Sequence, residues 1–487
     1  MVIGDDLSNA MPVEMTMLGA MGAVAASNDG TGCLDPHAGS SVGIGCAVSL
    51  LPDPSQSAVM RETAYPRFLL GSGIGTDAAD YQTYRDGKGY DALERAVMTM
   101  MPLEVDEEIR RADFLDRDGG GLPAYCKWET VQDSMGAEIV LVCNVAYHPD
   151  NSKEALLIES NPHQLIEGVV IAAYAVGAKQ AFIYIPEIYR CRAANLESAL
   201  SQAIDHAIVG VDILDSGAEV NVSLRYGPTI YSAGEETIPL EALEGKAARP
   251  RLGVRDPAVE GYRSLPTLVH SVETLMNLPV IIGKGADWYQ TIGVDGCNGT
   301  RLLTILGDVN EPGVIEVPCG ITVREAIFLA GGSVGDHLVK AVVNGGVGGL
   351  TLSEDGFDTP IMADGSGTLI VLDDTRCMTE AAYKNAMFFA SQSCGQCRSC
   401  KEGSATLASI LRDMMLGHGH AGDLEVMEEL ASQIGEVSRC RRGQSGPSVA
   451  YSAIQSFRSE FRIHVEGRVC PVGACPMNAV VESAKEI

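Results

Sequence analysis

Three cysteines of residues 393–403, SCGQCRSCKEG, have the C-x2-C-x2-C spacing. Thiolates at this spacing can supply three ligands to a four-iron cube, and the fourth ligand then comes from elsewhere in the chain. Cys440, in SRCRRGQS, is the next cysteine along. Structural zinc prefers two C-x2-C pairs or a nearby histidine, and no histidine accompanies this arc. Spacing alone therefore favours an iron–sulfur cluster at Cys394, Cys397, Cys400 and Cys440, and leaves zinc and free thiols as alternatives.

A bundle of amphipathic helices is expected to position these cysteines. The arc falls between the first two expected helices, and Cys440 falls between the third and the fourth. In the third, Leu424, Met427, Leu430 and Ile434 form one apolar stripe. Both ligand loops are therefore expected at one end of the bundle. The four segments are 379–392, 404–416, 423–434 and 448–461.

The first half of the chain alternates helix-like and strand-like segments. Residues 138–144 (EIVLVCN) and 180–186 (QAFIYIP) are continuous apolar runs, typical of strands buried on both faces. Such alternation favours an α/β fold with parallel strands, whose ligands lie at the carboxyl ends of the strands. The other expected elements are helices at 105–114, 161–178 and 196–208, and a strand at 219–225.

A glycine-rich turn, DRDGGGLPAYCKW, occupies residues 116–128 of this half. Backbone N–H groups of Gly119, Gly120 and Gly121 could bind a phosphate, helped by the cations of Arg117 and Lys127. A turn without any ligand explains the glycines about as well.

Residues 300–332 have a different pattern from the alternating helices and strands before them. RLLTIL and VIEVP read as strands around the turn GDVNEPG at 307–313. The segment 321–332 follows as a helix, with Thr322 and Glu325 at capping-box spacing. This order predicts a small β-grasp module, whose expected role is docking.

The bulk properties limit the classes of function. The 487 residues suggest roughly three domains, and the net charge of −29 argues against nucleic-acid binding. The most apolar stretch, 168–186, is interrupted by Lys179 and Gln180, so no transmembrane span is expected. The N-terminus is acidic where a signal peptide would be basic, which predicts a cytoplasmic protein with reduced or metal-bound cysteines.

Five segments in chain order resemble the flavin-binding, NADH-oxidising subunit of respiratory complex I. The same family has relatives in soluble NAD-linked hydrogenases, formate dehydrogenases and electron-bifurcating enzymes. The resemblance runs from about Arg67 to about Val465. Its segments are NPHQLIEGVVIAAYAVGA, YSAGEET…LEGK (231–246), PTLVHSVETLMNLP (266–279), GDVNEPGVIEVPCGITVREAI and SCGQCRSCKEG.

The resemblance implies an α/β Rossmann-like flavin domain, a small β-grasp domain and a C-terminal four-helix bundle carrying an iron–sulfur cluster. It implies [4Fe-4S] ligation by the four cysteines named above, FMN as a cofactor and NADH as the substrate. Expected partners are a small [2Fe-2S] thioredoxin-like subunit and a larger catalytic redox subunit. The flavin or nucleotide residues that it implies are Arg117, Gly119, Gly121, Lys127, Asn144, Tyr231, Gly234, Glu235, Glu236 and Ser271.

The sequence also departs from the family pattern around the nucleotide site. Asp116 and Asp118 stand where the family has glycines, and His270 and Ser271 stand where it has paired asparagines. The leading hypothesis is electron transfer from NADH through FMN to the cluster. The alternatives are a relay subunit with a degenerate NADH site, with or without flavin, and a zinc-stapled assembly protein. Further replacements are Leu122, Ala146, Tyr147, Pro149, Gly253 and Asp256.

Five regions are expected from these patterns. The last contains Cys470 and Cys475, which could be a ferredoxin-like remnant, half of a site shared with a partner, or an unligated tail. The N-terminal extension, the first region, contains Cys33 and Cys46, which we interpret as free thiols. The regions are an irregular extension at 1–60, a flavin and nucleotide domain at 61–275, a β-grasp-like domain at 276–375, the bundle at 376–465 and a tail at 466–487.

Overall fold

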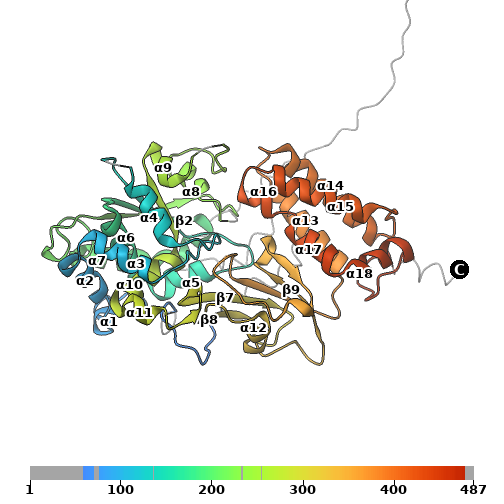
Figure 1. Ribbon diagram of the computed structural model, residues 1–487, viewed down its shortest axis with the longest axis horizontal. Coiled ribbons are helices and arrows are strands. Elements are labelled where there is room, and N and C mark those ends of the chain that lie inside the picture. The colour runs from blue at the N-terminus through green and yellow to red at the C-terminus, as the bar shows by residue number, and fades with distance from the viewer. Residues whose placement is uncertain (1–58, 71–75, 135, 232–233, 254, 478–487) are drawn as a thin grey trace, which may run out of the picture.

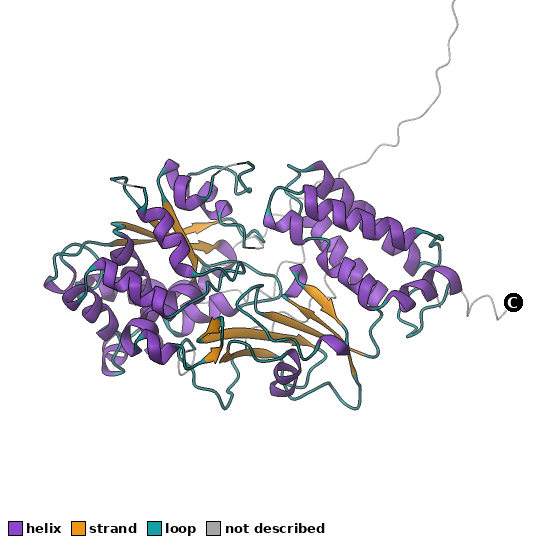
Figure 2. Cartoon of the chain, viewed as in Figure 1, coloured by secondary structure: helices purple, strands orange, loops and turns teal. Residues whose placement is uncertain are grey.

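The computed structural model describes residues 59–70, 76–134, 136–231, 234–253 and 255–477. An α/β part, a second sheet and an all-helical part follow one another along the molecule (Figures 1 and 2). Nearly all of the expected extension at 1–60, with Cys33 and Cys46, and the last part of the tail lie outside the described residues.

The first sheet is fully parallel, as the sequence predicts, and has the strand order β3-β2-β1-β4. The chain runs outward from β1 to β3 and then returns to place β4 on the other side of β1. The carboxyl ends of β1 and β4 therefore flank a topological switch point, where such sheets bind ligands. The sequence did not predict β4. The strands are β1 (Val140–Asn144), β2 (Gln180–Pro186), β3 (Asn221–Gly227) and β4 (Thr267–Ser271).

Helices pack around this sheet, and α6 packs directly against α10 at Gly168. A Cβ added there would lie 2.0 Å from the Leu275 carbonyl oxygen, so only glycine allows this contact. The helices are α1 (Tyr81–Asp86), α2 (Asp91–Thr99), α3 (Pro102–Arg111), α4 (Ala124–Gln132), α5 (Lys153–Ser160), α6 (Pro162–Val176), α7 (Ala194–Asp205), α8 (Thr237–Leu243), α9 (Pro257–Glu260), α10 (Val272–Lys284) and α11 (Ala286–Tyr289).

The second sheet is mixed, with the strand order β10-β9-β11-β7-β8. The predicted hairpin is confirmed as antiparallel β7 and β8, and β11 pairs parallel to β7. The predicted capping box of Thr322 and Glu325 begins α12 (Val323–Leu329). The strands are β7 (Thr300–Gly307), β8 (Gly313–Pro318), β9 (Val339–Asn344), β10 (Leu350–Leu352) and β11 (Thr368–Asp373), and a short separate pair is β5 (Gly293–Val294) and β6 (Cys297–Asn298).

The helical part begins with the three long helices that the sequence predicts. The predicted stripe is buried at Leu424, Met427 and Ile434 and partly buried at Leu430. The single fourth helix expected at 448–461 is wrong, because Phe457 has φ −127° and divides it in two. The helices are α13 (Met378–Gln392), α14 (Arg398–Met415), α15 (Asp423–Val437), α16 (Arg441–Ser445), α17 (Ser448–Ser456) and α18 (Arg458–Arg462).

Candidate functional site: a nucleotide-type cavity beside a cysteine cluster

A cavity of about 530 Å³ lies at the carboxyl edge of the first sheet. Asn144 ends β1 and Ser271 ends β4, and both line it. This is the switch point at which a doubly wound sheet binds its ligand. The loops of the second sheet and α16 close the cavity from the other sides, through Gly345, Gly348, Gly365, Ser366, Arg441, Gln444 and Ser445.

The predicted glycine-rich turn forms another wall of this cavity. Gly119 and Gly121 adopt φ of +97° and +60°, a region that favours glycine. A Cβ at Gly121 would lie 3.0 Å from the Asp364 backbone nitrogen, and Gly365 N–H donates to the Gly119 carbonyl at 3.2 Å. The turn therefore packs directly against the loop before β11, and its glycines allow that contact.

Asp116 lies behind the turn and does not line the cavity. Its carboxylate is fully buried, 2.8 Å from Lys127 Nζ and 2.9 Å from His270 Nδ1. Trp128 Nε1–H donates to His270 Nε2 at 2.8 Å, so the proton of His270 lies on Nδ1, the nitrogen that faces Asp116. Burial on its own raises the pKa of Asp116, but His270 and Lys127 hold it well below its usual range. Asp116 therefore fixes the turn rather than opposing a phosphate.

The positive charge of Lys127 is balanced by neighbouring carboxylates. Its Nζ pairs with Asp116, with Asp118 and, at 2.9 Å, with Glu236. Burial alone lowers the pKa of Lys127, and these three carboxylates together raise it well above its ordinary value. The cation expected to face a phosphate is thus already paired with acidic side chains.

Seven of the ten expected flavin or nucleotide residues line the cavity. Lys127 and Glu235 line a smaller neighbouring pocket, which shares Gly234 and Glu236 with the first. Gly121 lines neither of these two and supports the turn instead. The roles of all ten residues in binding flavin or nucleotide remain predictions. The seven are Arg117, Gly119, Asn144, Tyr231, Gly234, Glu236 and Ser271.

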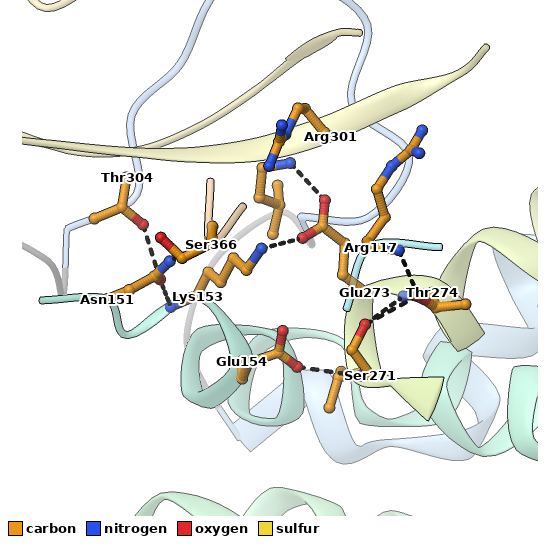
Figure 3. Close-up of polar contacts among 12 residues, drawn as sticks. Arg117, Asn151, Lys153, Glu154, Ser271, Glu273, Thr274, Arg301, Thr304 and Ser366 are labelled. Carbon is orange, nitrogen blue, oxygen red and sulfur yellow. Dashed lines mark hydrogen bonds and ion pairs between the residues drawn. The ribbon is translucent and has the colours of Figure 1, made fainter. Parts of the chain in front are cut away.

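The loop after β1 and the first turn of α5 contribute site residues that the sequence analysis missed. Lys153 Nζ lies 2.6 Å from Glu273 Oε2, and Leu302 N–H donates to Glu273 Oε1 at 2.7 Å (Figure 3). Asn151 accepts from Thr304 Oγ1 at 2.9 Å in the same figure, so the loop joins the two sheets. Because this loop follows a buried strand, the rule of carboxyl strand ends could have pointed to Lys153 and Glu154.

Burial shifts the pKa of several groups in this loop and at the start of α5. It raises the pKa of Glu154 to about 8 and that of Asp150 to about 6. It lowers the pKa of His148 to about 4. Glu154 accepts from Val272 N–H at 3.1 Å, and Asp150 accepts from Val347 N–H at 2.8 Å. His148 and Glu154, which line the cavity, are therefore mostly neutral at pH 7, whereas Asp150 is mostly ionised.

The cysteine arc lies at the junction of α13 and α14. Cys394 is in the loop and Cys397 is the N-cap of α14, but Cys400 lies inside the first turn of α14. The expectation that all three precede the second helix was therefore wrong for Cys400. Cys440 is the N-cap of α16. A Cβ at Gly443 of α16 would lie 3.6 Å from Cys400 Cβ, so both ligand loops meet at one end of the bundle, as predicted.

In the described part of the chain, these four cysteines are not among the side-chain groups placed to hold a single metal ion. A lone tetrahedral zinc ion requires closer thiolates, whereas an iron–sulfur cube spaces its ligands further apart.

The short helix α16 lies between the cavity and the cysteine cluster and borders both. Arg441, Gln444 and Ser445 follow Cys440 within one short helix, and all three line the cavity. Ser445 Oγ is buried and has no hydrogen-bond partner among the residues that the structure describes. A polar ligand in the cavity would give it one.

A nucleotide-type cavity at a switch point, one short helix from a four-cysteine cluster, defines a flavo-iron–sulfur electron-transfer subunit. Three family models match: the Nuo51 FMN-binding domain at residues 109–280, the SLBB domain at 302–343 and the NADH-ubiquinone oxidoreductase-F iron-sulfur binding region at 380–464.

Individual relatives match over most of their length. An NADH-quinone oxidoreductase subunit of Rhizobium meliloti is 37% identical over 400 residues, covering 80% of this chain and 95% of the relative. The HndC subunit of the NADP-reducing hydrogenase of Solidesulfovibrio fructosivorans is 33% identical over 398 residues, covering 80% and 81%. The crystal structure of an NAD+-reducing [NiFe]-hydrogenase in the H2-reduced state aligns with a TM-score of 0.71 and 27% identity, covering 83% of this chain and 69% of that chain.

The chain belongs to the NADH-quinone oxidoreductase family of FMN-binding, iron–sulfur subunits. It is an electron-transfer oxidoreductase subunit with an FMN-binding domain and a [4Fe-4S] region. Within the described residues, no helix has the length and apolar character needed to cross a membrane.

Proposed function

We propose that NADH is oxidised in the cavity between the two sheets and that its electrons leave through Cys394, Cys397, Cys400 and Cys440. The observation that carries this proposal is the position of α16. Its N-cap is a cluster cysteine, and its next residues line the cavity. FMN, when bound, supplies the conversion between two-electron and one-electron chemistry.

The chain's own residues can bind and orient both nucleotides. The turn lines the cavity at Gly119 and can present its backbone to a phosphate there, whereas the Gly120 N–H already donates to Asp118 Oδ1 at 2.8 Å. Arg441 has no carboxylate within ion-pair distance in the described part of the chain, so its charge is available to an anionic ligand, unlike that of Lys127. Asn144 and Ser271 present polar groups at the strand ends, and the Tyr231 ring offers an apolar face.

The test is anaerobic purification of the full chain, quantification of iron, sulfide and flavin, and titration with NADH. We expect one flavin and one four-iron cluster per chain, loss of flavin absorbance on adding NADH, and the spectroscopic signal of a reduced cluster. A loaded cluster without flavin or nucleotide binding would favour the relay alternative instead. Zinc without iron or sulfide would overturn both in favour of the non-redox assembly protein.

We also propose the finer assignments that the family favours. The strand order of the second sheet, with parallel β7 and β11 at its centre, supports a β-grasp module. Residue 275 lies inside α10, so we place the end of the flavin domain after α11 and keep the other expected boundaries. The relatives' names describe subunits of larger enzymes, which supports a multisubunit complex for this chain. Within that proposal we keep the expected partners, a small [2Fe-2S] thioredoxin-like subunit and a larger redox subunit, and the expected cytoplasmic location.

A further inference from the structure

Four potential metal ligands converge at the end of the bundle away from the cluster cysteines. Cys377 is the N-cap of α13, whereas Cys394 follows the other end of this helix. A helix of 15 residues spans about 22 Å. Cys377 is joined by His464, Cys470 and Cys475, and the four ligand atoms all lie within 4.8 Å of one another.

The distances between these atoms match a tetrahedral ion. Cys377 Sγ lies 3.3 Å from His464 Nε2 and 3.5 Å from Cys475 Sγ, and Cys475 Sγ lies 3.4 Å from His464 Nε2. With zinc–sulfur bonds of about 2.3 Å, the edges of a tetrahedron are about 3.8 Å long. The two sulfurs are also much further apart than the roughly 2.05 Å of a disulfide.

The contact of His464 Nδ1 with a backbone carbonyl leaves Nε2 able to bind a metal ion. His464 Nδ1 lies 2.8 Å from the Glu460 carbonyl oxygen, which can only accept, so Nδ1 holds the proton. The lone pair of Nε2 therefore points at the sulfurs, as in zinc sites where a carbonyl orients the histidine. Glu380 N–H approaches Cys377 Sγ at 3.5 Å, which favours a thiolate there.

The ligands are enclosed and come from separate segments. Their exposed fractions are 1% for Cys377, 0% for His464, 2% for Cys470 and 3% for Cys475. Met415, Met477, Val472 and Tyr383 pack around them. Between Cys470 and Cys475 the chain turns at Gly473, with φ +74° and its N–H donating to the Cys470 carbonyl at 3.1 Å. His464 lies in the helical turn at Ile463–Gly467.

We propose that this chain binds one structural zinc ion at Cys377, His464, Cys470 and Cys475, which ties the segment after the bundle to the start of α13. Three thiolates and one imidazole are a usual donor set for structural zinc, with no open position for a substrate. The site explains Cys470 and Cys475 within this chain, without a ferredoxin-like remnant or ligands from a partner. It does not depend on the proposed NADH activity.

The test is elemental analysis of the full chain, purified anaerobically and passed over a chelating resin. We expect about one zinc per chain beside the cluster iron. Cys475→Ser and His464→Asn should lose most of the zinc and keep the iron and sulfide. The matched control Cys191→Ser, at an exposed thiol in the α/β part, should keep both.

A measurement on the unmutated chain guards against variants that fail to fold. Growth with cobalt should yield the absorption bands of tetrahedral Co²⁺ bound to thiolates, and added zinc should remove them. The proposal is overturned by wild-type protein with a full complement of cluster iron and no zinc. Undiminished zinc in Cys475→Ser, or a mononuclear iron at this position, would also overturn it.

Discussion

At the scale of single residues, Cys440 connects the cavity to the cluster, because it is the N-cap of the helix that lines the cavity. Replacing it by serine removes a thiolate that an iron–sulfur cluster requires. We expect Cys440→Ser to lose the [4Fe-4S] signal in electron paramagnetic resonance and most of its iron, while NADH still bleaches any bound flavin. Cys191→Ser serves as the control. A four-iron signal of wild-type intensity in Cys440→Ser would remove Cys440 from the ligand set.

Glu154 gives a prediction on pH dependence. Burial raises its pKa from 4.5 to about 8 in the folded chain. Between these values the folded state holds a proton that the unfolded state has lost, so stability falls as the pH rises through this window. Glu154→Gln has no such proton to lose.

The measurement is the thermal unfolding midpoint at pH 5.5 and at pH 8.5. The midpoint of wild type should drop more between them than that of Glu154→Gln. Glu219→Gln, at the exposed pair with Lys179, should follow wild type. Equal drops in Glu154→Gln and wild type would show that Glu154 is ionised throughout.

At the scale of elements, the buried pair of Lys153 and Glu273 holds the start of α5 to α10 and β7 (Figure 3). Removing one partner leaves an uncompensated buried charge, which costs about 3–5 kcal/mol. We expect Lys153→Met to lower the free energy of unfolding by about that amount in denaturant titrations. The double variant Lys153→Met with Glu273→Gln should recover part of the loss.

The exposed pair of Lys179 and Glu219 is the matched control for this change. Its atoms are 3.0 Å apart, but the Lys179 side chain is 70% exposed. Such pairs contribute about 0–1 kcal/mol, so Lys179→Met should change little. Similar losses in the two lysine variants would mean that Lys153 is not held in a dry site.

The crossing of α6 and α10 gives a second prediction at this scale. A Cβ at Gly168 would meet the Leu275 carbonyl oxygen at 2.0 Å, whereas one at Gly283 would meet only Ala92 Cβ at 3.6 Å. Overpacking of this kind costs about 1–3 kcal/mol. Gly168→Ala should therefore lower the unfolding midpoint, and Gly283→Ala should leave it unchanged or raise it, since alanine favours helix by about 1 kcal/mol. Equal effects would contradict this close approach.

At the scale of the whole molecule, what the sequence predicts and what it misses have physical reasons. Strands β1 and β2 are continuous apolar runs, so their place in a doubly covered sheet is a local property. Strand β4 is different: its buried His270 depends on two residues far away in the sequence, since Trp128 donates to one ring nitrogen and Asp116 faces the other.

Some parts of the candidate site can be predicted from the sequence, and others cannot. The cysteine arc and the glycine turn are local patterns, and the sequence shows both. The walls formed by the loops at 345–366 and by α16 exist only once three domains have packed together, and so does the convergence of Cys377 with His464. Spacing along the chain carries no information on such contacts, because the segments are joined only by tertiary packing.

The three parts of the molecule meet at one apolar contact, and this contact gives the last prediction. Tyr231 of the α/β part, Val347 in the turn between β9 and β10 of the second sheet, and Phe389 of α13 form a buried cluster beside the cavity. The Phe389 ring lies 6.0 Å from that of Tyr231 and packs directly against Gly446, just after α16. Phe389→Ala should cost about 3–5 kcal/mol and loosen α16 against the cavity.

Electron transfer depends steeply on distance, so that loosening should slow the flow of electrons from the cavity to the cluster. We expect stopped-flow mixing of Phe389→Ala with NADH to show flavin bleaching at the wild-type rate, followed by slower reduction of the cluster. Phe328→Ala, at a side chain that is 81% exposed, should match wild type in both phases. An unchanged rate of cluster reduction in a destabilised Phe389→Ala would show that α16 is held in place without this contact between the domains.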